Sequence, residues 1–171
     1  MQSRVFIGIG SNIGDKIRNC IDSIKVIAHD KKARIRSASS LYLASPVSDI
    51  AQEDFVNCAV SIDWDGTASE LLRLLNSIES GMGRKRSIKN GPRIIDLDIL
   101  LFGDALIDEA SLTVPHPELH RRKFAIVPCI EIEEGIIHPS YNKPLKEFLP
   151  HIDDDQKIVL LKDRKEVPDF N

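Results

Sequence analysis

Two carboxylates and a group of arginines lie close together in the middle of the chain. Asp96 and Asp98 are two residues apart in an apolar stretch typical of a β-strand, so both side chains project from one face, roughly 6.5–7 Å apart at the backbone. Two like charges that close repel each other unless a cation lies between them. The preceding segment 83–90 holds four cations and no acid. Carboxylates that bind Mg²⁺, beside arginines that neutralise phosphate, are the components of a phosphoryl-transfer site.

Each of these features alone has an ordinary explanation. An Asp-x-Asp pair on a strand is more often a solvated face than a metal site, and a basic run is more often a solvated loop than a ligand clamp. In this chain the two features meet at a turn whose backbone is fixed by Pro92. Their adjacency favours a joint metal and phosphate site.

Length and composition limit the possible classes of protein. The 171 residues fit one domain, and we expect its core to span about residues 4–150, with 151–171 as an extension or loose tail. The 23 basic and 26 acidic residues give a net charge of −3, which argues against a general nucleic-acid binder. No apolar run reaches the roughly 18–20 residues of a membrane span, and the N-terminus lacks a signal-peptide core. We therefore expect a cytoplasmic protein that binds neither nucleic acid nor membranes.

The three cysteines are widely spaced and form no Cys-x-x-Cys motif. Cys20, Cys58 and Cys129 each lie among apolar residues. This pattern predicts small buried side chains rather than a redox or metal role.

Hydrophobic periodicity predicts an α+β fold. The order is strand, helix, strand, strand, helix, strand, over residues 5–9, 17–28, 33–42, 55–64, 68–82 and 95–102. Thr67 and Glu70 have the spacing of a capping box at the start of the second helix. This βαββαβ order is that of the ferredoxin-like fold, in which a four-stranded antiparallel sheet carries two helices on one face.

The two faces of the last predicted strand have different roles. Ile95, Leu97, Ile99 and Leu101 alternate with the aspartates, so we expect them on the core side. The other face must be covered by later elements or form a site. The candidates are a short extended piece at 106–107, a turn at 114–117 and a helix near 121–129.

Two nucleotide-binding motifs are excluded or disfavoured. The glycines from Gly8 to Gly14 follow a strand, but their spacing is G-x-G-x-x-x-G, and the next strand carries Arg34 and Arg36 instead of an acid that binds ribose. A dinucleotide-binding fold is therefore disfavoured. The chain also lacks the P-loop pattern, so any ATP chemistry is of another kind.

His116 lies in a rigid turn between Pro115 and Pro117, ahead of Arg121 and Arg122. A lone histidine is usually structural or exposed, and contact with a nucleotide is an equally weighted alternative here. The other four histidines show no ligand spacing.

These residues together resemble the 6-hydroxymethyl-7,8-dihydropterin pyrophosphokinases of folate biosynthesis, over about residues 5–132. The resemblance rests on the sequence Gly-Pro-Arg-x-x-Asp-x-Asp at 91–98 and on Leu-Thr-Val-Pro-His-Pro at 112–117. It also includes Ile-Gly-Ser-Asn at 9–12, Pro46, Phe-Val-Asn at 55–57, and Gly-Arg-x-Arg at 83–86. It implies transfer of pyrophosphate from ATP to the pterin hydroxymethyl group, with release of AMP.

The resemblance also implies a role for individual residues. Asp96 and Asp98 would hold two Mg²⁺ ions, Asp96 would contact the pterin substrate as well, and Arg84 and Arg93 would neutralise charge on the phosphates in the transition state. The implied nucleotide-binding residues are Asn76, Glu79, Arg84, Arg86, Arg93, Ile99, Thr113, His116 and Arg122. The implied pterin pocket is Ala44, Pro46, Val47, Phe55, Asn57 and Phe124, with the two phenylalanines on the ring and Asn57 on its polar edge. The partners would be small-molecule substrates, and the protein a monomer or weak homo-oligomer.

Several positions differ from the usual family pattern. Asn90 stands where an aromatic residue often precedes Gly-Pro-Arg, and Ser111 replaces an arginine of some members. Ala44 and Phe55 replace hydroxyl-bearing residues. Because segment 84–90 is rich in cations and poor in apolar anchors, we expect a mobile loop that closes over bound ligands.

Two other classes of function remain open at this point. A two-metal nucleotidyltransferase on a palm-like ferredoxin fold also uses paired strand aspartates, although this chain lacks a broad basic stripe. A non-enzymatic ligand-binding module would leave the cations and the aspartates without a joint purpose.

Overall fold

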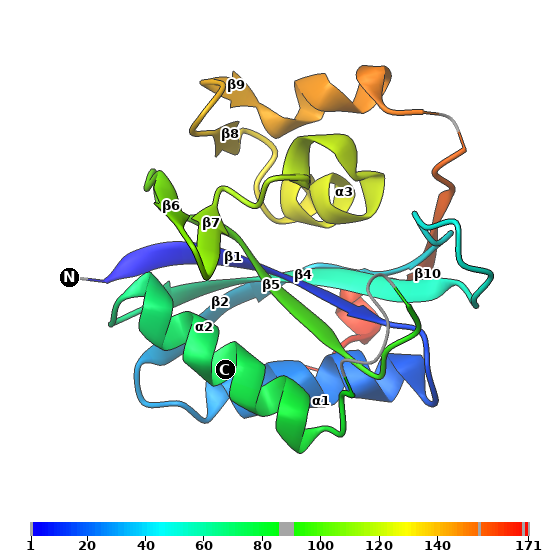
Figure 1. The fold of residues 1–171 in the computed structure, drawn as a ribbon, viewed down its shortest axis with the longest axis horizontal. Coiled ribbons are helices and arrows are strands. Elements are labelled where there is room, and N and C mark those ends of the chain that lie inside the picture. The colour runs from blue at the N-terminus through cyan, green and yellow to red at the C-terminus, as the bar shows by residue number, and fades with distance from the viewer. Residues whose placement is uncertain (1, 86–90, 154, 169, 171) are drawn as a thin grey trace.

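The computed structural model describes residues 2–85, 91–153, 155–168 and 170 (Figure 1). In this part of the chain one antiparallel sheet has six strands. Five of them follow the order β10-β3-β4-β1-β5, and the sixth, β2, pairs with β4. The strands are β1 (Ser3–Ser11), β2 (Ala33–Ala38), β3 (Leu41–Ala44), β4 (Phe55–Trp64), β5 (Asp96–Phe102) and β10 (Ile158–Lys162). The predicted α+β class is confirmed.

Two helices cover one face of the sheet. They are α1 (Lys16–Ala28) and α2 (Ala68–Gly81), and Figure 1 shows both on the same side. The predicted capping box begins α2, because the Thr67 hydroxyl accepts the Glu70 amide at 3.2 Å and the Glu70 carboxylate accepts the Thr67 amide at 2.7 Å. Apolar residues of both helices and the sheet, including Ile24, Leu71 and Trp64, form the larger buried cluster.

The opposite face is covered by later elements, as expected. The helix α3 (Lys123–Ile132) lies across it in Figure 1 and packs against Phe6, Ala59 and Leu100. The remaining elements are β6 (Ile107–Glu109), β7 (Leu112–Val114), η1 (Leu119–Arg121), β8 (Ile137–His138), β9 (Lys143–Pro144), η2 (Leu145–His151) and η3 (Arg164–Glu166). Thus α3 begins and ends slightly later than the predicted 121–129, because Arg121 belongs to a separate 3-10 turn.

The sheet differs from the four predicted strands in two places. The predicted strand 33–42 is broken at Ser39 and Ser40, whose side chains form hydrogen bonds in place of a continuous ladder. The Ser39 hydroxyl accepts the Ala59 amide at 2.9 Å, and the Ser40 hydroxyl donates to Glu131 at 2.7 Å. Two short strands, β2 and β3, therefore share the neighbouring strand β4.

The described residues of the C-terminal segment extend the sheet, which is one of the two alternatives expected from the sequence. Its apolar residues form β10, which pairs antiparallel with β3, and Val167 and Phe170 pack against the main core. Local sequence could not distinguish the extension from the loose tail, because pairing of distant strands leaves no local signal.

A bulge in β5 changes the predicted facing of one residue. Phe6 pairs with Leu101 while Ile7 pairs with Ile99, so Leu100 is an extra residue. Ile95, Leu97 and Ile99 pack with the helices as predicted, but Leu101 packs with the α3 cluster.

Two further observations concern the cysteines and the helices. Cys20, Cys58 and Cys129 are buried and free, which confirms their predicted burial.

None of the helices in the described part of the chain has the length and apolar character that a membrane crossing requires.

Candidate active site

A cavity of about 580 Å³ opens on the α3 side of the sheet and extends past the β5 edge to α2. Its floor is built from two rows of residues that cross three strands. Gly10 on β1 pairs with Asn57 on β4 and with Asp96 on β5, and Gly8 pairs with Ala59 and Asp98. Because the central strand contributes glycines to both rows, β1 places no side chain between the amide on one side and the carboxylates on the other, and the side chains of Asn57 and Leu100 lie over the glycines.

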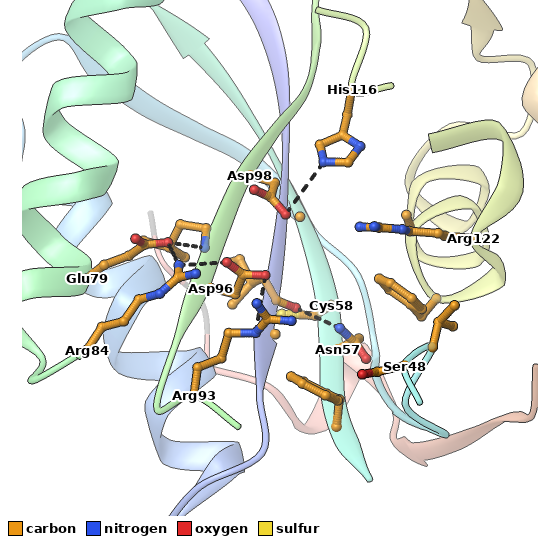
Figure 2. A pocket seen from close by; sticks show the side chains of 18 of the residues that line it. Ser48, Asn57, Cys58, Glu79, Arg84, Arg93, Asp96, Asp98, His116 and Arg122 are labelled. Atoms are coloured by element: carbon orange, nitrogen blue, oxygen red, sulfur yellow. Dashed lines mark hydrogen bonds and ion pairs between the residues drawn. The ribbon is translucent and has the colours of Figure 1, made fainter. Parts of the chain in front are cut away.

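Most of the predicted site residues line this cavity. They come from the loop after β3, from β4, α2, β5, the turn after β7 and α3, so residues about 80 positions apart in sequence lie around one space (Figure 2). The predicted residues in the cavity wall are Val47, Phe55, Asn57, Asn76, Glu79, Arg84, Arg93, Asp96, Asp98, His116, Arg122 and Phe124.

Other predicted residues lie elsewhere. Ala44 is buried beside Phe55 in the sheet, Ile99 faces the α1 and α2 core, and Thr113 is exposed on β7. These three, together with Pro46, are not among the residues that line the cavity. Arg86 falls outside the described residues, as does most of the predicted mobile loop 84–90. Their proposed contacts with ligands remain predictions.

Asp96 lies at the centre of a network of charges. The Arg84 guanidinium donates through Nη1 to Glu79 and, at 2.6 Å, to Asp96 Oδ1. The Nε atom of Arg93 lies 3.5 Å from Asp96 Oδ2. Glu79 is itself fixed, because its buried carboxylate accepts the Leu97 amide at 2.8 Å. Burial disfavours the charge of Arg84, but Asp96 and Glu79 outweigh it and raise its pKa.

Arg84 has acidic partners from other parts of the chain. The segment 83–90 has no acid of its own, but α2 and β5 supply Glu79 and Asp96. Figure 2 shows Arg84 and Arg93 converging on Asp96, while His116 reaches Asp98 from the other side.

Within the described residues, Asp98 forms no ion pair with an arginine, whereas Asp96 pairs with two. Burial and the nearby charge of Asp96 raise its pKa to about 7, although Arg122 and Arg93 act in the opposite direction. The imidazole of His116 lies nearby, with its Nε2 3.9 Å from Asp98 Oδ2. Ionised Asp98 is therefore an unfavourable group in the substrate-free cavity.

His116 is neutral at physiological pH. Burial and the charge of Arg122 lower its pKa to about 4. Its Nδ1 accepts the Glu118 amide at 3.1 Å, so the ring proton lies on Nε2, the nitrogen nearest Asp98. The side chain can thus present an N–H group to an anionic ligand.

The donor set suits Mg²⁺ better than a metal that needs a full cage of protein ligands. In residues 2–85, 91–153, 155–168 and 170, no cluster of three or more histidine, cysteine or acidic side chains could hold a metal ion. Mg²⁺ commonly takes one or two carboxylates and completes its coordination with water and substrate phosphates. Asp96 and Asp98 supply two such carboxylates, and a bound cation would compensate the unfavourable negative charge of Asp98.

The opposite end of the cavity is aromatic and polar. The Arg93 guanidinium lies 5.3 Å from the centre of the Phe55 ring, and Arg122 lies 5.7 Å from that of Phe124. Asn57 is 7% exposed, and its Oδ1 has no hydrogen-bond partner among the residues that the structure describes, whereas its Nδ2 makes a long contact of 3.5 Å with the Ile9 carbonyl. A buried acceptor of this kind needs a donor, which a bound heterocycle can supply.

Several residues of the cavity wall were not predicted from the sequence. Gly8 and Gly10 were named in a disfavoured dinucleotide motif, and Gly10 also in the family resemblance, but neither was predicted to line the site, yet a Cβ on Gly10 would lie 2.8 Å from Asn57 Nδ2. The sequence pattern that could have identified them is two glycines at alternate positions of a buried strand, which often indicates that another group approaches the backbone closely. Ser48, Gln52 and Leu72 also line the cavity, and no local pattern distinguished them.

Comparison with known proteins identifies the family. Residues 6–134 match the model of the family described as 7,8-dihydro-6-hydroxymethylpterin-pyrophosphokinase (HPPK). The chain belongs to the HPPK family. A pyrophosphokinase of Aquifex aeolicus is 39% identical over 146 residues, which are 85% of this chain and 90% of that relative. One from Haemophilus influenzae is 33% identical over 149 residues, covering 85% and 93%.

A solved HPPK structure supports the fold. A crystal structure of Plasmodium falciparum HPPK-DHPS has a TM-score of 0.71 at 15% identity, over 96% of this chain and 50% of the Plasmodium chain. Family membership makes the present chain an enzyme, a diphosphotransferase of folate biosynthesis with ATP as co-substrate. The resemblance inferred from the sequence is confirmed.

Proposed function

We propose that the cavity binds MgATP and 6-hydroxymethyl-7,8-dihydropterin side by side, and that pyrophosphate passes between them above β5. The observation that supports this proposal is that one cavity has two chemically different ends. The Asn57 end is aromatic with an unpartnered acceptor, and the Asp96 end is a network of carboxylates and arginines. Gly10 separates the two ends in one row of the sheet.

The pterin ring would lie between Phe55 and Phe124. Its N–H groups would donate hydrogen bonds to Asn57 Oδ1, and its ring acceptors would accept a hydrogen bond from Asn57 Nδ2. This arrangement discriminates against other heterocycles, because a ring without the matching groups leaves the buried amide unpaired. The backbone of residues 44–47 would close the pocket beside it.

Asp96 and Asp98 would hold two Mg²⁺ ions, which neutralise the phosphates and orient the attack when they are bound. Arg84 and Arg93 now share Asp96, and phosphate oxygens offer them an alternative acceptor at the same place. Their permanent charge and forked geometry suit the charge that develops in the transition state. His116 and Arg122 would contact the nucleotide from the α3 side, and Asn76 and Glu79 from α2.

The reaction follows from this placement. The hydroxymethyl oxygen forms a bond to the β-phosphorus of ATP and loses its proton. The bond from the β-phosphorus to the α,β-bridging oxygen breaks, and its electron pair leaves with AMP. The protein contributes position, charge neutralisation and exclusion of water rather than a covalent intermediate.

The fold and context of the enzyme are also part of the proposal. The order β5-β1-β4-β2, with antiparallel neighbours and both α1 and α2 on one face, supports a ferredoxin-like core within a single domain. A cytoplasmic location and a monomeric or weakly associated state remain proposals.

A product assay with MgATP tests the function. We expect AMP release that depends on 6-hydroxymethyl-7,8-dihydropterin, with one AMP formed per pterin diphosphate. Release of inorganic pyrophosphate instead of AMP would show nucleotidyl transfer. Binding of both ligands with no turnover would show a ligand-binding module. Either result would contradict the proposal.

A further inference from the structure

We infer that Asn12 is a positioning residue that couples the pterin end of the cavity to its phosphate end. Asn12 belongs to the Gly-Ser-Asn sequence at the end of β1, which the proposed chemistry does not use. It is 3% exposed and is not among the residues that line the cavity. The inference rests on the proposed function, because it assigns the two ends to two substrates.

The side chain of Asn12 joins two segments that are about 40 residues apart. Its Nδ2 donates to Gln52 Oε1 at 2.9 Å and to the Glu53 carbonyl at 3.1 Å. Its Oδ1 accepts the Arg93 amide at 2.8 Å, and its own amide donates to the Arg93 carbonyl at 3.1 Å. Only one orientation of the amide satisfies both sides, since a backbone N–H faces one end and a carbonyl the other.

The two joined segments serve different ends of the cavity. Residues 45–54 contribute Val47, Ser48 and Gln52 to the wall and lead directly into Phe55, whereas residues 91–93 contribute Gly91, Pro92 and Arg93. Figure 2 shows Ser48 near Asn57, and Arg93 next to Asp96. A ligand that orders one segment therefore orders part of the wall for the other ligand through Asn12, so each substrate should bind more tightly when the other is present.

A neighbouring residue, Lys16, provides a matched control, because it contacts only the first of the two segments. Lys16 binds the first segment from outside, with its Nζ 3.0 Å from the Asp54 carbonyl and 2.7 Å from the Glu53 carboxylate. The Nδ2 atom of Asn19 lies 3.3 Å from the carbonyl of Ile94, the residue that follows the second segment. The side chain of Asn12 contacts both.

The test measures binding of 6-hydroxymethylpterin by calorimetry, with and without a non-hydrolysable Mg-ATP analogue. The ratio of the two dissociation constants is the coupling factor, and we expect it to be on the order of tenfold in the wild-type protein. Asn12→Asp keeps the acceptor for Arg93 but places a carboxylate against Gln52 and Glu53. It should lower the coupling factor to about one. Lys16→Met should weaken pterin binding by no more than a few-fold and leave the coupling factor unchanged.

Gln52→Leu provides a second variant in case the buried Asn12→Asp protein does not fold. It removes one acceptor of Asn12 from a partly exposed side chain and should reduce the coupling factor partially. A wild-type coupling factor in either Asn12→Asp or Gln52→Leu, an equal loss in Lys16→Met, or no coupling in the wild-type protein would overturn the inference. AMP release by the wild-type protein would still stand in each case, so failure of the inference is distinguishable from failure of the proposed function.

Discussion

Replacing Asp98 with asparagine should stabilise the substrate-free protein at alkaline pH. Burial and Asp96 raise the pKa of Asp98 from 3.8 to about 7, so the folded protein disfavours the ionised carboxylate. In the unfolded chain the same group ionises near its ordinary pKa of about 3.9. The folded state therefore binds this proton more tightly than the unfolded state. The associated stability is present below about pH 4 and is lost as the pH rises through about 7.

The structure limits the size of this effect. At about 1.36 kcal/mol for each pKa unit, the change from 3.8 to about 7 corresponds to at most about 4 kcal/mol. The Asp98 side chain keeps 40% of its exposure, so solvent screens much of this interaction. We expect asparagine to add roughly 1–2 kcal/mol to the free energy of unfolding at pH 8. Near pH 4.5, where the wild-type carboxyl is protonated in the folded state, the difference should be close to zero.

Urea unfolding in EDTA at the two pH values measures this difference, provided that the m-value is unchanged. Asp96→Asn is the matched control, because Arg84 and Arg93 already compensate the Asp96 carboxylate. Asp96→Asn removes this carboxylate and should destabilise the protein by roughly 1.5–3 kcal/mol, which is the usual contribution of a hydrogen bond to a charged group. The reasoning is refuted if Asp98→Asn is less stable than wild type at pH 8, or if its advantage is the same at both pH values.

Three further predictions concern the pterin pocket and the cysteines. Asn57→Ala should weaken pterin binding by about 1–3 kcal/mol and leave ATP binding almost unchanged, and equal losses by calorimetry would exclude a pterin-specific role. Gly10→Ala should also weaken pterin binding selectively, because its Cβ would lie 2.8 Å from Asn57 Nδ2, and unchanged pterin affinity would show that the amide can move without cost. The thiols should react with Ellman's reagent only after unfolding, because burial raises the pKa of Cys129 to about 12, while a hydrogen bond with Cys20 and burial raise that of Cys58. Rapid reaction of the native protein would contradict this last prediction.

Local sequence patterns predicted the elements that carry the site. The strand Phe55–Trp64 has the predicted ends, and the Thr67 capping box begins α2, because both depend on neighbouring residues. Alternation also placed Asp96 and Asp98 on the face opposite the α1 and α2 core. These predictions required only the period of a strand or the hydrogen bonds of a helix end.

Predictions that depended on distant residues were less successful. Segment 83–90 itself contains no acid, and local pattern did not show that the end of α2 and the start of β5 would place Glu79 and Asp96 against Arg84. The pairing of β10 with β3 and the extra residue Leu100 depend on register between separate strands. The hydrogen bonds of Asn12 likewise join segments that only the folded chain brings together.

The most direct test of the central claim is the single-turnover rate of AMP formation by Asp98→Asn with saturating MgATP and 6-hydroxymethyl-7,8-dihydropterin. This variant is expected to be at least as stable as the wild-type protein, so unfolding cannot explain a loss of activity. If Asp96 and Asp98 hold Mg²⁺ for pyrophosphate transfer, the rate should fall by about a thousandfold or more, equivalent to at least about 4 kcal/mol of transition-state stabilisation. A folded variant that retains the rate within tenfold of wild type would contradict the assignment of this cavity as the site of transfer.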